Sequence, residues 1–123
     1  MARLLLVDDD TAGLELRKLI LEREGHQVST AADVTAARSL FVDTRPDTVV
    51  LDLRLPESED GLALIRAFRG ASSDVRIVVL SGWTPDLEGQ PEAQMVDELL
   101  SKPVRSARLV NAVAAGATGS KPK

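Results

Sequence analysis

The sequence predicts an α/β fold in which five parallel strands form one sheet with helices on both faces. Two observations support this prediction. Short apolar runs alternate along the chain with segments in which apolar residues recur at helical spacing. The runs lack alternating polar positions, which is typical of parallel strands buried on both faces. A helical segment between each pair of runs supplies the crossover that parallel strands need.

The elements are expected in a regular order. The predicted strands are residues 4–7, 27–31, 48–53, 75–80 and 98–101. The predicted helices follow these strands at about residues 11–24, 34–44, 61–69 and 107–115. We expect Asp33, Asp60 and Ser106 to be N-caps, because their side-chain oxygens accept hydrogen bonds from exposed amides of a first turn. The five strands fit the flavodoxin-like doubly wound order 2-1-3-4-5.

The sequence between the fourth and fifth strands disfavours a long helix. Pro85, Gly89 and Pro91 fall in this short stretch. Proline removes a backbone donor and glycine adds conformational freedom, so both disfavour a helix interior. We therefore expect about five helices, of which the fourth, near residues 85–94, is short, irregular or mobile.

Length and composition indicate a single globular domain. The chain has 123 residues, of which 44% are hydrophobic and 28% charged, as in ordinary globular domains. We expect one domain over residues 1–116 and a flexible tail over 117–123. The net charge of −4 and the lack of a basic stripe argue against nucleic-acid contact by this domain.

The same composition narrows the chemistry and the location. The chain has no cysteine, which excludes disulfides, thiolate catalysis and cysteine-ligated metals. No stretch resembles a signal peptide or is long enough to insert into a membrane. The expectation is a cytoplasmic protein.

Polar side chains lie at the carboxyl ends of four of the predicted strands. Asp8 and Asp9 come after the first strand, Asp52 lies in the third, Ser81 follows the fourth and Lys102 follows the fifth. Ligands of open α/β sheets bind beyond the carboxyl ends of the strands, where these residues converge. Strands one and three would be neighbours about 4.8 Å apart. Asp8 and Asp9 would therefore face Asp52.

Such a cluster suits phosphoryl chemistry. Converging carboxylates repel one another, and a divalent cation or the Lys102 ammonium relieves the repulsion. Oxygen ligands without histidine or cysteine favour Mg²⁺, which keeps coordination positions open for a phosphoryl oxygen. A metal, an ammonium and the Ser81 hydroxyl are groups that hold a phosphoryl group. Asp52 is the central carboxylate and a candidate nucleophile.

Five short motifs now identify a family by resemblance. Their order and spacing resemble the receiver domain of two-component response regulators: LLVDDD at 5–10, LDLRLP at 51–56, DG at 60–61, LSG at 80–82 and SKP at 101–103. The resemblance covers about residues 3–115. It implies a phosphoacceptor switch, not an enzyme, that receives a phosphoryl group from a histidine kinase or phosphotransfer protein. A surface altered by phosphorylation would then be read by an unknown downstream protein.

The resemblance also implies a role for each acidic residue and a cofactor. Asp52 would accept the phosphoryl group and contribute a ligand to Mg²⁺. Asp9 would bind Mg²⁺ directly, and Asp8 would act through a water. The backbone carbonyl of Arg54 would be a further ligand.

The remaining implied roles belong to the last two strands. Ser81 would donate a hydrogen bond to a phosphoryl oxygen, and Lys102 would pair first with the carboxylate and then with the phosphoryl group. The Lys102–Pro103 peptide is often cis in this family. One position departs from the common pattern, because Leu99 replaces the aromatic residue whose rotamer usually reports phosphorylation.

Three other functions remain open at this stage. A receiver-like interaction module that works without phosphorylation is favoured by Leu99 and by the interrupted fourth helix. An aspartyl-phosphate phosphatase of the haloacid dehalogenase type would need a second acid where Arg54 stands. A flavodoxin-like electron carrier would need serine and threonine in the loop that here carries three aspartates. The sequence also leaves open whether the domain stands alone or belongs to a larger protein.

Three further side chains receive structural predictions. His26 follows a glycine that ends a helix and is expected at the surface or at a boundary, because no second histidine supports a functional role. Trp83 is expected to pack within its loop. The side chain of Arg54 is expected to face solvent.

Overall fold

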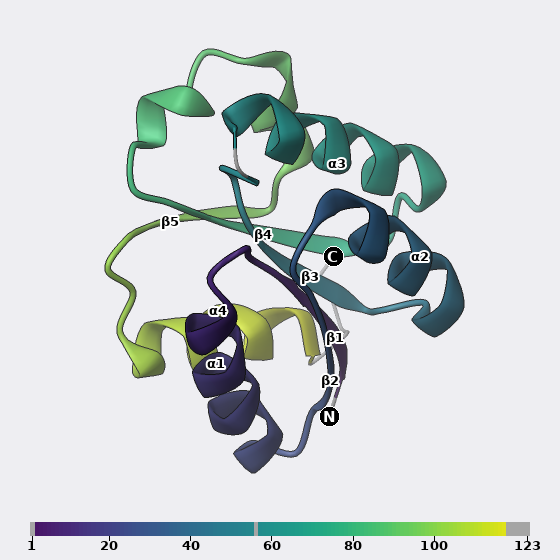
Figure 1. Cartoon of the computed structure of the whole chain (residues 1–123), viewed down its shortest axis with the longest axis vertical. Helices are drawn as coiled ribbons and strands as arrows, with labels where there is room; N and C mark the ends of the chain where they lie inside the picture. The colour runs from purple at the N-terminus through teal and green to yellow at the C-terminus, as the bar shows by residue number, and fades with distance from the viewer. Residues whose placement is uncertain (1, 56, 118–123) are drawn as a thin grey trace.

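A computed structural model describes residues 2–55 and 57–117 of the chain. Within these residues, five parallel strands form one sheet in the order β2-β1-β3-β4-β5, which confirms the predicted doubly wound topology (Figure 1). The strands are β1 Arg3–Val7, β2 Gln27–Ala31, β3 Thr48–Asp52, β4 Arg76–Ser81 and β5 Glu98–Ser101.

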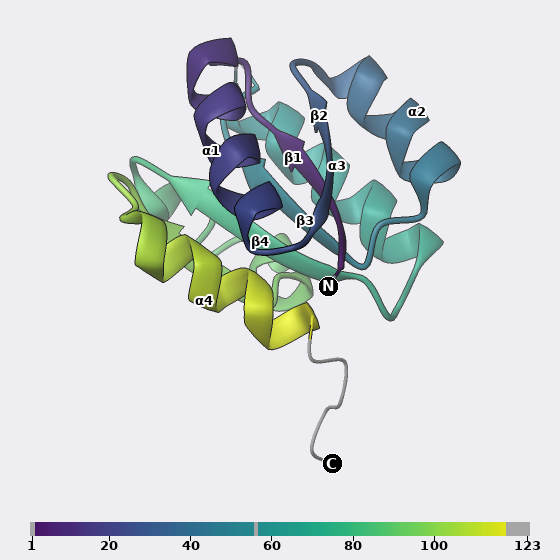
Figure 2. The same cartoon turned by 90° about the horizontal axis from the view of Figure 1, so that it is seen from below.

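The helices cover the two faces of the sheet in pairs. Helices α1 and α4 lie on one face, and α2 and α3 lie on the other (Figure 2). Their bounds are α1 Thr11–Arg23, α2 Val34–Thr44, α3 Ser58–Ala71 and α4 Ser106–Ala117. Two short 3-10 helices, η1 Thr84–Asp86 and η2 Pro91–Met95, occupy the connection between β4 and β5. The described residues thus contain four α-helices, one fewer than expected.

Each strand contributes side chains to two separate cores. Leu4 and Leu6 of β1 pack in the core under α1 and α4, whereas Leu5 and Val7 pack in the core under α2 and α3. Successive side chains of a strand point to opposite faces, so a strand covered on both sides must be apolar throughout. This is the physical reason that β1, β3 and β4 carry unbroken apolar runs, whereas the edge strand β2 is more polar and less buried.

The segment that replaces the fourth helix follows its proline and glycine residues. Pro85 lies in η1, Pro91 begins η2, and Gly89 between them has a φ of +91°. Proline fits the first turn of a helix but stops its growth from the preceding residues, and a positive φ favours glycine. The prediction of a short, irregular fourth helix is confirmed.

Helix α3 begins earlier than expected. The prediction that Asp60 caps it is wrong, because the helix starts at Ser58 and Glu57 is the N-cap residue. Asp60 instead lies in the first turn, where its Oδ2 accepts a hydrogen bond from the Glu57 amide at 3.1 Å. A carboxylate in this position satisfies an exposed donor and interacts favourably with the helix dipole.

The next residue, Gly61, brings α3 against the sheet. A Cβ atom at Gly61 would lie 2.0 Å from the carbonyl oxygen of Leu53, far inside van der Waals contact. Only glycine permits this approach of a helix to the residue that follows β3. The aspartate–glycine motif thus has a steric explanation in this chain.

The other helix starts divide between confirmed and corrected predictions. Asp33 is the N-cap of α2, and its side chain accepts from a first-turn amide at 2.8 Å, as predicted. Asp10 caps α1 in the same way. Ser106 is the first residue of α4 rather than its cap, because the carbonyl of Arg105 accepts the first helical hydrogen bond, from the Leu109 amide at 3.0 Å.

The end of the chain is described only as far as Ala117. Helix α4 includes Gly116 and Ala117, so it extends one residue past the expected domain boundary. Residues 118–123 of the expected tail lie outside the described part. Among the described residues, no helix has the length and apolar composition needed to cross a membrane.

Candidate functional site

The register of β1 and β3 places two aspartates side by side. Val7 pairs with Leu51, so the next residues, Asp8 and Asp52, are level with each other at the carboxyl edge of the sheet. Asp8 is 2% exposed and Asp52 is 9% exposed, whereas the neighbouring Asp9 is exposed. Each of these three residues offers a carboxylate oxygen, and the three atoms lie within 4.8 Å of one another. We call these three residues the acid cluster.

The last two strands bring a hydroxyl and an ammonium to the same edge. Ser81 pairs with Ser101, and Lys102 follows directly. The Nζ of Lys102 lies 2.7 Å from Oδ2 of Asp52 and 3.7 Å from Oδ2 of Asp8. The amide of Lys102 donates to the carbonyl of Ser81 at 2.8 Å, and the Lys102–Pro103 peptide is cis.

Electrostatics in the acid cluster are only partly balanced. Burial raises the pKa of Asp52, the hydrogen bond from Lys102 lowers it, and the nearby negative charge of Asp8 raises it again, with a net rise above the usual value. Removing a carboxylate from water disfavours its charged form, and a second carboxylate nearby adds to this effect. The acid cluster therefore has a deficit of positive charge.

A second cation in this site was missed by the sequence analysis. Arg17 of α1 places Nη2 2.6 Å from Oδ2 of Asp8. The signal was present, because Arg17 lies three residues after Leu14 and four before Leu21, the two buried leucines of α1. A charged residue on the buried stripe of a helix needs a partner from another element.

Arg54 also contacts the site, through its backbone. Its amide lies 3.3 Å from Oδ1 of Asp52 and donates a hydrogen bond to it. The Arg54 side chain is 56% exposed, as predicted, but its Nε and Nη2 lie 2.8 Å and 2.7 Å from Oδ2 of Asp86. This ion pair joins the loop after β3 to η1, and the sequence had not indicated it.

Family comparison agrees with this geometry. The model of the response regulator receiver domain matches residues 4–114. The chain belongs to this family. Receiver domains are signalling domains of two-component systems, so membership supports a phosphoacceptor role and not that of a classical enzyme. It also favours this function over the phosphatase and electron-carrier alternatives.

Two curated proteins illustrate the relationship of this receiver domain to longer regulators. It is 35% identical over 113 residues to the photosynthetic apparatus regulatory protein RegA of Rhodobacter capsulatus, covering 91% of this chain and 61% of RegA. It is 38% identical over 115 residues to the transcriptional regulatory protein PrrA of Mycobacterium leprae, covering 92% of this chain and 48% of PrrA. The chain thus spans roughly half to three fifths of the length of these relatives.

Solved structures show the same fold. A response regulator receiver domain from Methylobacillus flagellatus has a TM-score of 0.83 and 29% identity, and the match covers 94% of this chain and 98% of that one. The response regulator protein TrrA of Thermotoga maritima, solved in complex with Mg²⁺-BeF, has a TM-score of 0.83 and 28% identity, and covers 94% and 99% of the two chains.

One prediction about a side chain in this receiver domain is wrong. Trp83 does not pack within its loop but is 60% exposed, while its amide donates to Ser81 Oγ at 3.0 Å. His26, expected at the surface or at a boundary, lies at the boundary between α1 and β2 and is 9% exposed, and its Nδ1 accepts a hydrogen bond from the Ala2 amide at 3.1 Å. Burial lowers the pKa of His26, which favours the neutral form that can accept this bond. Leu99, in place of the usual aromatic residue, packs partly buried against the core under α2 and α3.

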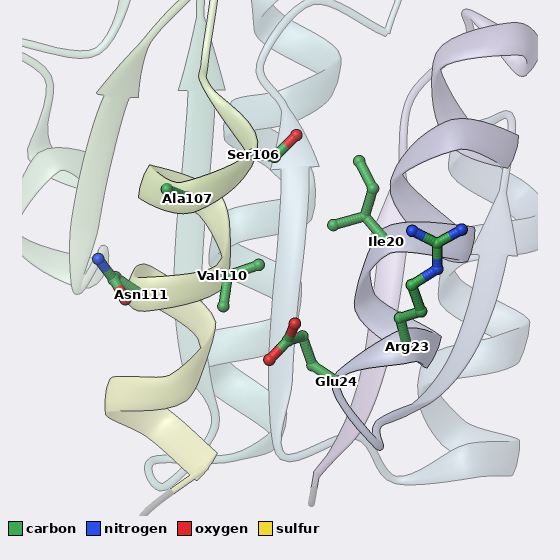
Figure 3. Close-up of a pocket in the computed structure, with 7 residues that line it drawn as sticks. All are labelled: Ile20, Arg23, Glu24, Ser106, Ala107, Val110 and Asn111. Atoms are coloured by element: carbon green, nitrogen blue, oxygen red, sulfur yellow. The ribbon is translucent and has the colours of Figure 1, made fainter.

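A separate groove of about 470 Å³ lies between α1 and α4 (Figure 3). Ile20 and Val110 face each other across it, and Arg23, Glu24 and Asn111 line its polar parts. None of its lining residues belongs to the acid cluster, and Lys102 does not line it either. The groove is therefore distinct from the acid cluster.

Proposed function

We propose that Asp52 accepts a phosphoryl group from the phosphohistidine of a histidine kinase or a phosphotransfer protein. One observation carries the proposal: the nearly buried Asp52 carboxylate lies at the carboxyl edge of the sheet, beside two other carboxylates and 2.7 Å from the Lys102 ammonium. A purely structural carboxylate would be paired and hydrogen-bonded without this additional cluster of negative charge.

The transfer is a substitution at phosphorus. A carboxylate oxygen of Asp52 forms the new P–O bond as the P–N bond to the donor histidine breaks, and the electron pair of that bond remains on the histidine nitrogen. Lys102 is close enough to pair with the phosphoryl oxygens as negative charge shifts onto them. Hydrolysis of the aspartyl phosphate by water would restore the carboxylate.

The acid cluster fits Mg²⁺. All of its donors are oxygens, and three carboxylate atoms lie within 4.8 Å. Asp9 and Asp52 would bind the ion directly, Asp8 would act through a water, and the Arg54 carbonyl would add a ligand. When bound, Mg²⁺ would balance the negative charge of the carboxylates and of the phosphoryl oxygens. The TrrA complex with Mg²⁺-BeF is consistent with this assignment.

Ser81 is the proposed hydrogen-bond donor to the phosphoryl group. Its Oγ already accepts from the Trp83 amide at 3.0 Å, and a hydroxyl can donate while it accepts. Reorientation of Ser81 toward a phosphoryl oxygen would alter this bond and the loop that carries Trp83. Phosphorylation would thereby change a surface that a downstream protein reads.

The partners follow from this role. The proposed upstream partner is a histidine kinase or phosphotransfer protein, and the downstream partner is a protein of unknown identity. We propose that this domain itself makes no nucleic-acid contact and does not insert into membranes, because its net charge is −4 and no basic stripe is present. The cytoplasmic location stays a prediction, as does the division into a domain of residues 1–116 and a tail.

One alternative has its own support. Leu99 and the interrupted connection before β5 depart from the common receiver pattern, and both favour an interaction module that works without phosphorylation. This module would retain the fold and the acid cluster but would not form an aspartyl phosphate.

Intact-mass spectrometry after incubation with acetyl phosphate and Mg²⁺ separates these functions. We expect one added phosphoryl group, which is lost in Asp52→Asn and when Mg²⁺ is chelated. Asp74→Asn removes an exposed carboxylate at the opposite edge of the sheet and should be phosphorylated normally. Modification that persists in Asp52→Asn would contradict the assignment of Asp52. No modification in a folded protein that binds Mg²⁺ would favour the interaction module.

A further inference from the structure

Arg17 occupies an unusual place for a charged residue. It lies on the stripe of α1 that faces the sheet, between the buried Leu14 and Leu21. Its side chain is only 20% exposed. Burial of a guanidinium without a partner is costly, so the position requires an acceptor from another part of the fold.

Asp8 is that acceptor, and its carboxylate is engaged by the contact with Arg17. Nη2 of Arg17 lies 2.6 Å from Oδ2 of Asp8, while the Asp10 amide donates to Oδ1 of Asp8 at 3.0 Å. Both oxygens of a carboxylate that is 2% exposed are thus bound by groups of the chain itself. Asp52 is also bound at both oxygens, by the Arg54 amide and by Lys102. Asp9, the exposed member of the acid cluster, therefore has the most freedom to bind a cation directly.

The charge balance shows what Arg17 contributes. The acid cluster carries three negative charges, and Lys102 and Arg17 supply two positive charges within hydrogen-bond distance of Asp52 and Asp8. Without Arg17, an arriving cation would meet one more uncompensated negative charge. Arginine remains protonated at all relevant pH values, so its contribution is constant.

We propose that Arg17 is a positioning residue that serves as an internal counterion of the acid cluster and sets its affinity for Mg²⁺. This inference rests on the proposed function, because it assumes that the acid cluster binds the metal. Arg17 pairs with Asp8 and holds its carboxylate in place when no metal is bound. It also repels the incoming ion and therefore weakens binding. The contact therefore stabilises the metal-free fold at the expense of metal affinity.

The first test compares the loss of one positive charge at two places on the same helix. Arg17→Gln should bind Mg²⁺ about tenfold more tightly than the wild type in a calorimetric titration, because repulsion between two close cations is lost. Arg23→Gln is the matched control, since Arg23 is exposed in the last turn of α1 and makes the same change in net charge. Its affinity should stay within about twofold, because exposed charges are screened beyond about 10 Å.

The second test measures unfolding with and without the metal. Arg17→Gln should be less stable than the wild type in chelator, and this difference should shrink or reverse at saturating Mg²⁺, because an ion that binds the folded state stabilises it. Should Arg17→Gln be unfolded in chelator, we expect Mg²⁺ to restore folding. Arg17→Lys retains the charge and should resemble the wild type in affinity. A residue needed only for packing would lower stability equally under both conditions and leave the affinity unchanged.

Two failures can be told apart. If the wild type takes up a phosphoryl group and binds Mg²⁺, but Arg17→Gln binds it no more tightly than Arg23→Gln, the inference about Arg17 is wrong and the proposed function stands. An Arg17→Gln variant that stays unfolded at saturating Mg²⁺ also overturns the inference. If the wild type neither binds Mg²⁺ nor is phosphorylated, the proposed function is wrong, and the inference about Arg17, which rests on it, is wrong as well.

Discussion

The acid cluster and the β4–β5 connection, residues 82–97, are built by different means although the Arg54–Asp86 ion pair joins them. The carboxylates of Asp8 and Asp52 follow from the register of two buried strands, so the backbone positions them. The connection has only two short 3-10 helices and depends on side chains of α3. The difference teaches that strand register positions the acid cluster, whereas side-chain ion pairs attach the irregular connection to the rest of the fold.

Arg69 is the main attachment of the connection. Its Nε and Nη2 donate to the carbonyl of Met95 at 3.1 and 2.8 Å, and Nη2 lies 3.0 Å from Oδ2 of Asp97. Its Nη1 donates to the carbonyls of Ser73 and Val75 at 3.0 and 2.8 Å. One guanidinium thus binds a backbone acceptor and a carboxylate of the connection and at the same time two carbonyls of the loop between α3 and β4.

An ion pair between a buried glutamate and a half-exposed arginine provides the second attachment. Glu92 of η2 is 5% exposed and pairs with Arg66 of α3. The hydrogen bond from Arg66 lowers the pKa of Glu92 and outweighs the opposing effect of burial. The connection is therefore attached to α3 at two points one helical turn apart, which supports an ordered docking of its second half.

The largest loss of stability is expected at Gly61, where α3 packs closely against the residue that follows β3. Gly61→Ala places a Cβ atom 2.0 Å from the Leu53 carbonyl oxygen, and the helix and strand cannot both stay in place. We expect a loss of about 3 kcal/mol or more in the free energy of unfolding, measured by urea denaturation. Gly70→Ala in the same helix has nothing within 4 Å of the added Cβ and should be neutral or slightly stabilising. A Gly61→Ala variant as stable as the wild type would show that the backbone of α3 and the residue after β3 are not held as closely as the comparison requires.

Removal of the main attachment should have the next largest effect. Arg69→Met keeps the aliphatic stem but loses the hydrogen bonds to five residues, and we expect a loss of about 2 kcal/mol. Hydrogen exchange should become faster at residues 91–97 and stay slow in β3. Arg38→Met changes an exposed arginine of α2 and serves as the control. Equal acceleration in β3 and in the connection would mean that the two regions do not differ in their attachment.

Neutralising Asp52, the proposed phosphoacceptor, should stabilise the metal-free protein. Because the pKa of Asp52 is raised in the folded state, its stabilising contribution is complete below the usual value of 3.8 and is lost as pH rises through the folded pKa. Asp52→Asn should therefore be more stable than the wild type at pH 7 by about 1 kcal/mol, and the difference should vanish in acid. Unfolding measured from pH 3 to 8 in chelator tests this. A variant less stable at pH 7 would show that pairing with Lys102 outweighs the burial and repulsion.

The smallest effect is expected for the link between the two regions. Arg54→Ala removes a pair in which the arginine is 56% exposed, and such pairs contribute about 0.5 kcal/mol. Exchange of the amides of Asp86, Leu87 and Glu88 in and after η1 should become faster, and high salt should remove the difference from the wild type. A large loss of stability that persists in high salt would assign Arg54 a role beyond this pair.

Local pattern predicted most of the fold. Apolar runs identified β1, β3, β4 and β5, because strands covered on both faces carry no polar alternation. The edge strand β2, Gln27–Ala31, is more polar and was placed by its position between two helical segments. Pro85, Gly89 and Pro91 predicted the interrupted fourth helix for a reason that lies within a few residues. The start of α3 was missed, because Asp60 is a favoured N-cap residue type whereas Glu57 is not, and the close approach of Gly61 to Leu53 is not local.

The acid cluster could also be predicted from the sequence. Asp8, Asp52 and Lys102 each follow or end a strand, and parallel strands place their carboxyl ends at one edge, so their meeting depends only on topology. The partners of the long side chains were not predictable in the same way. Arg17 reaches Asp8, and Arg69 reaches Met95 across a helix–loop boundary.

Sequence alone therefore determined which residues gather at the edge of the sheet, because backbone direction and strand order place them there. Only the tertiary structure decided how their charges are balanced and how the β4–β5 connection is held. An arginine or lysine side chain has several rotatable bonds and many possible acceptors within reach. Its partner is selected by the packing of elements distant in sequence, and no local pattern records that choice.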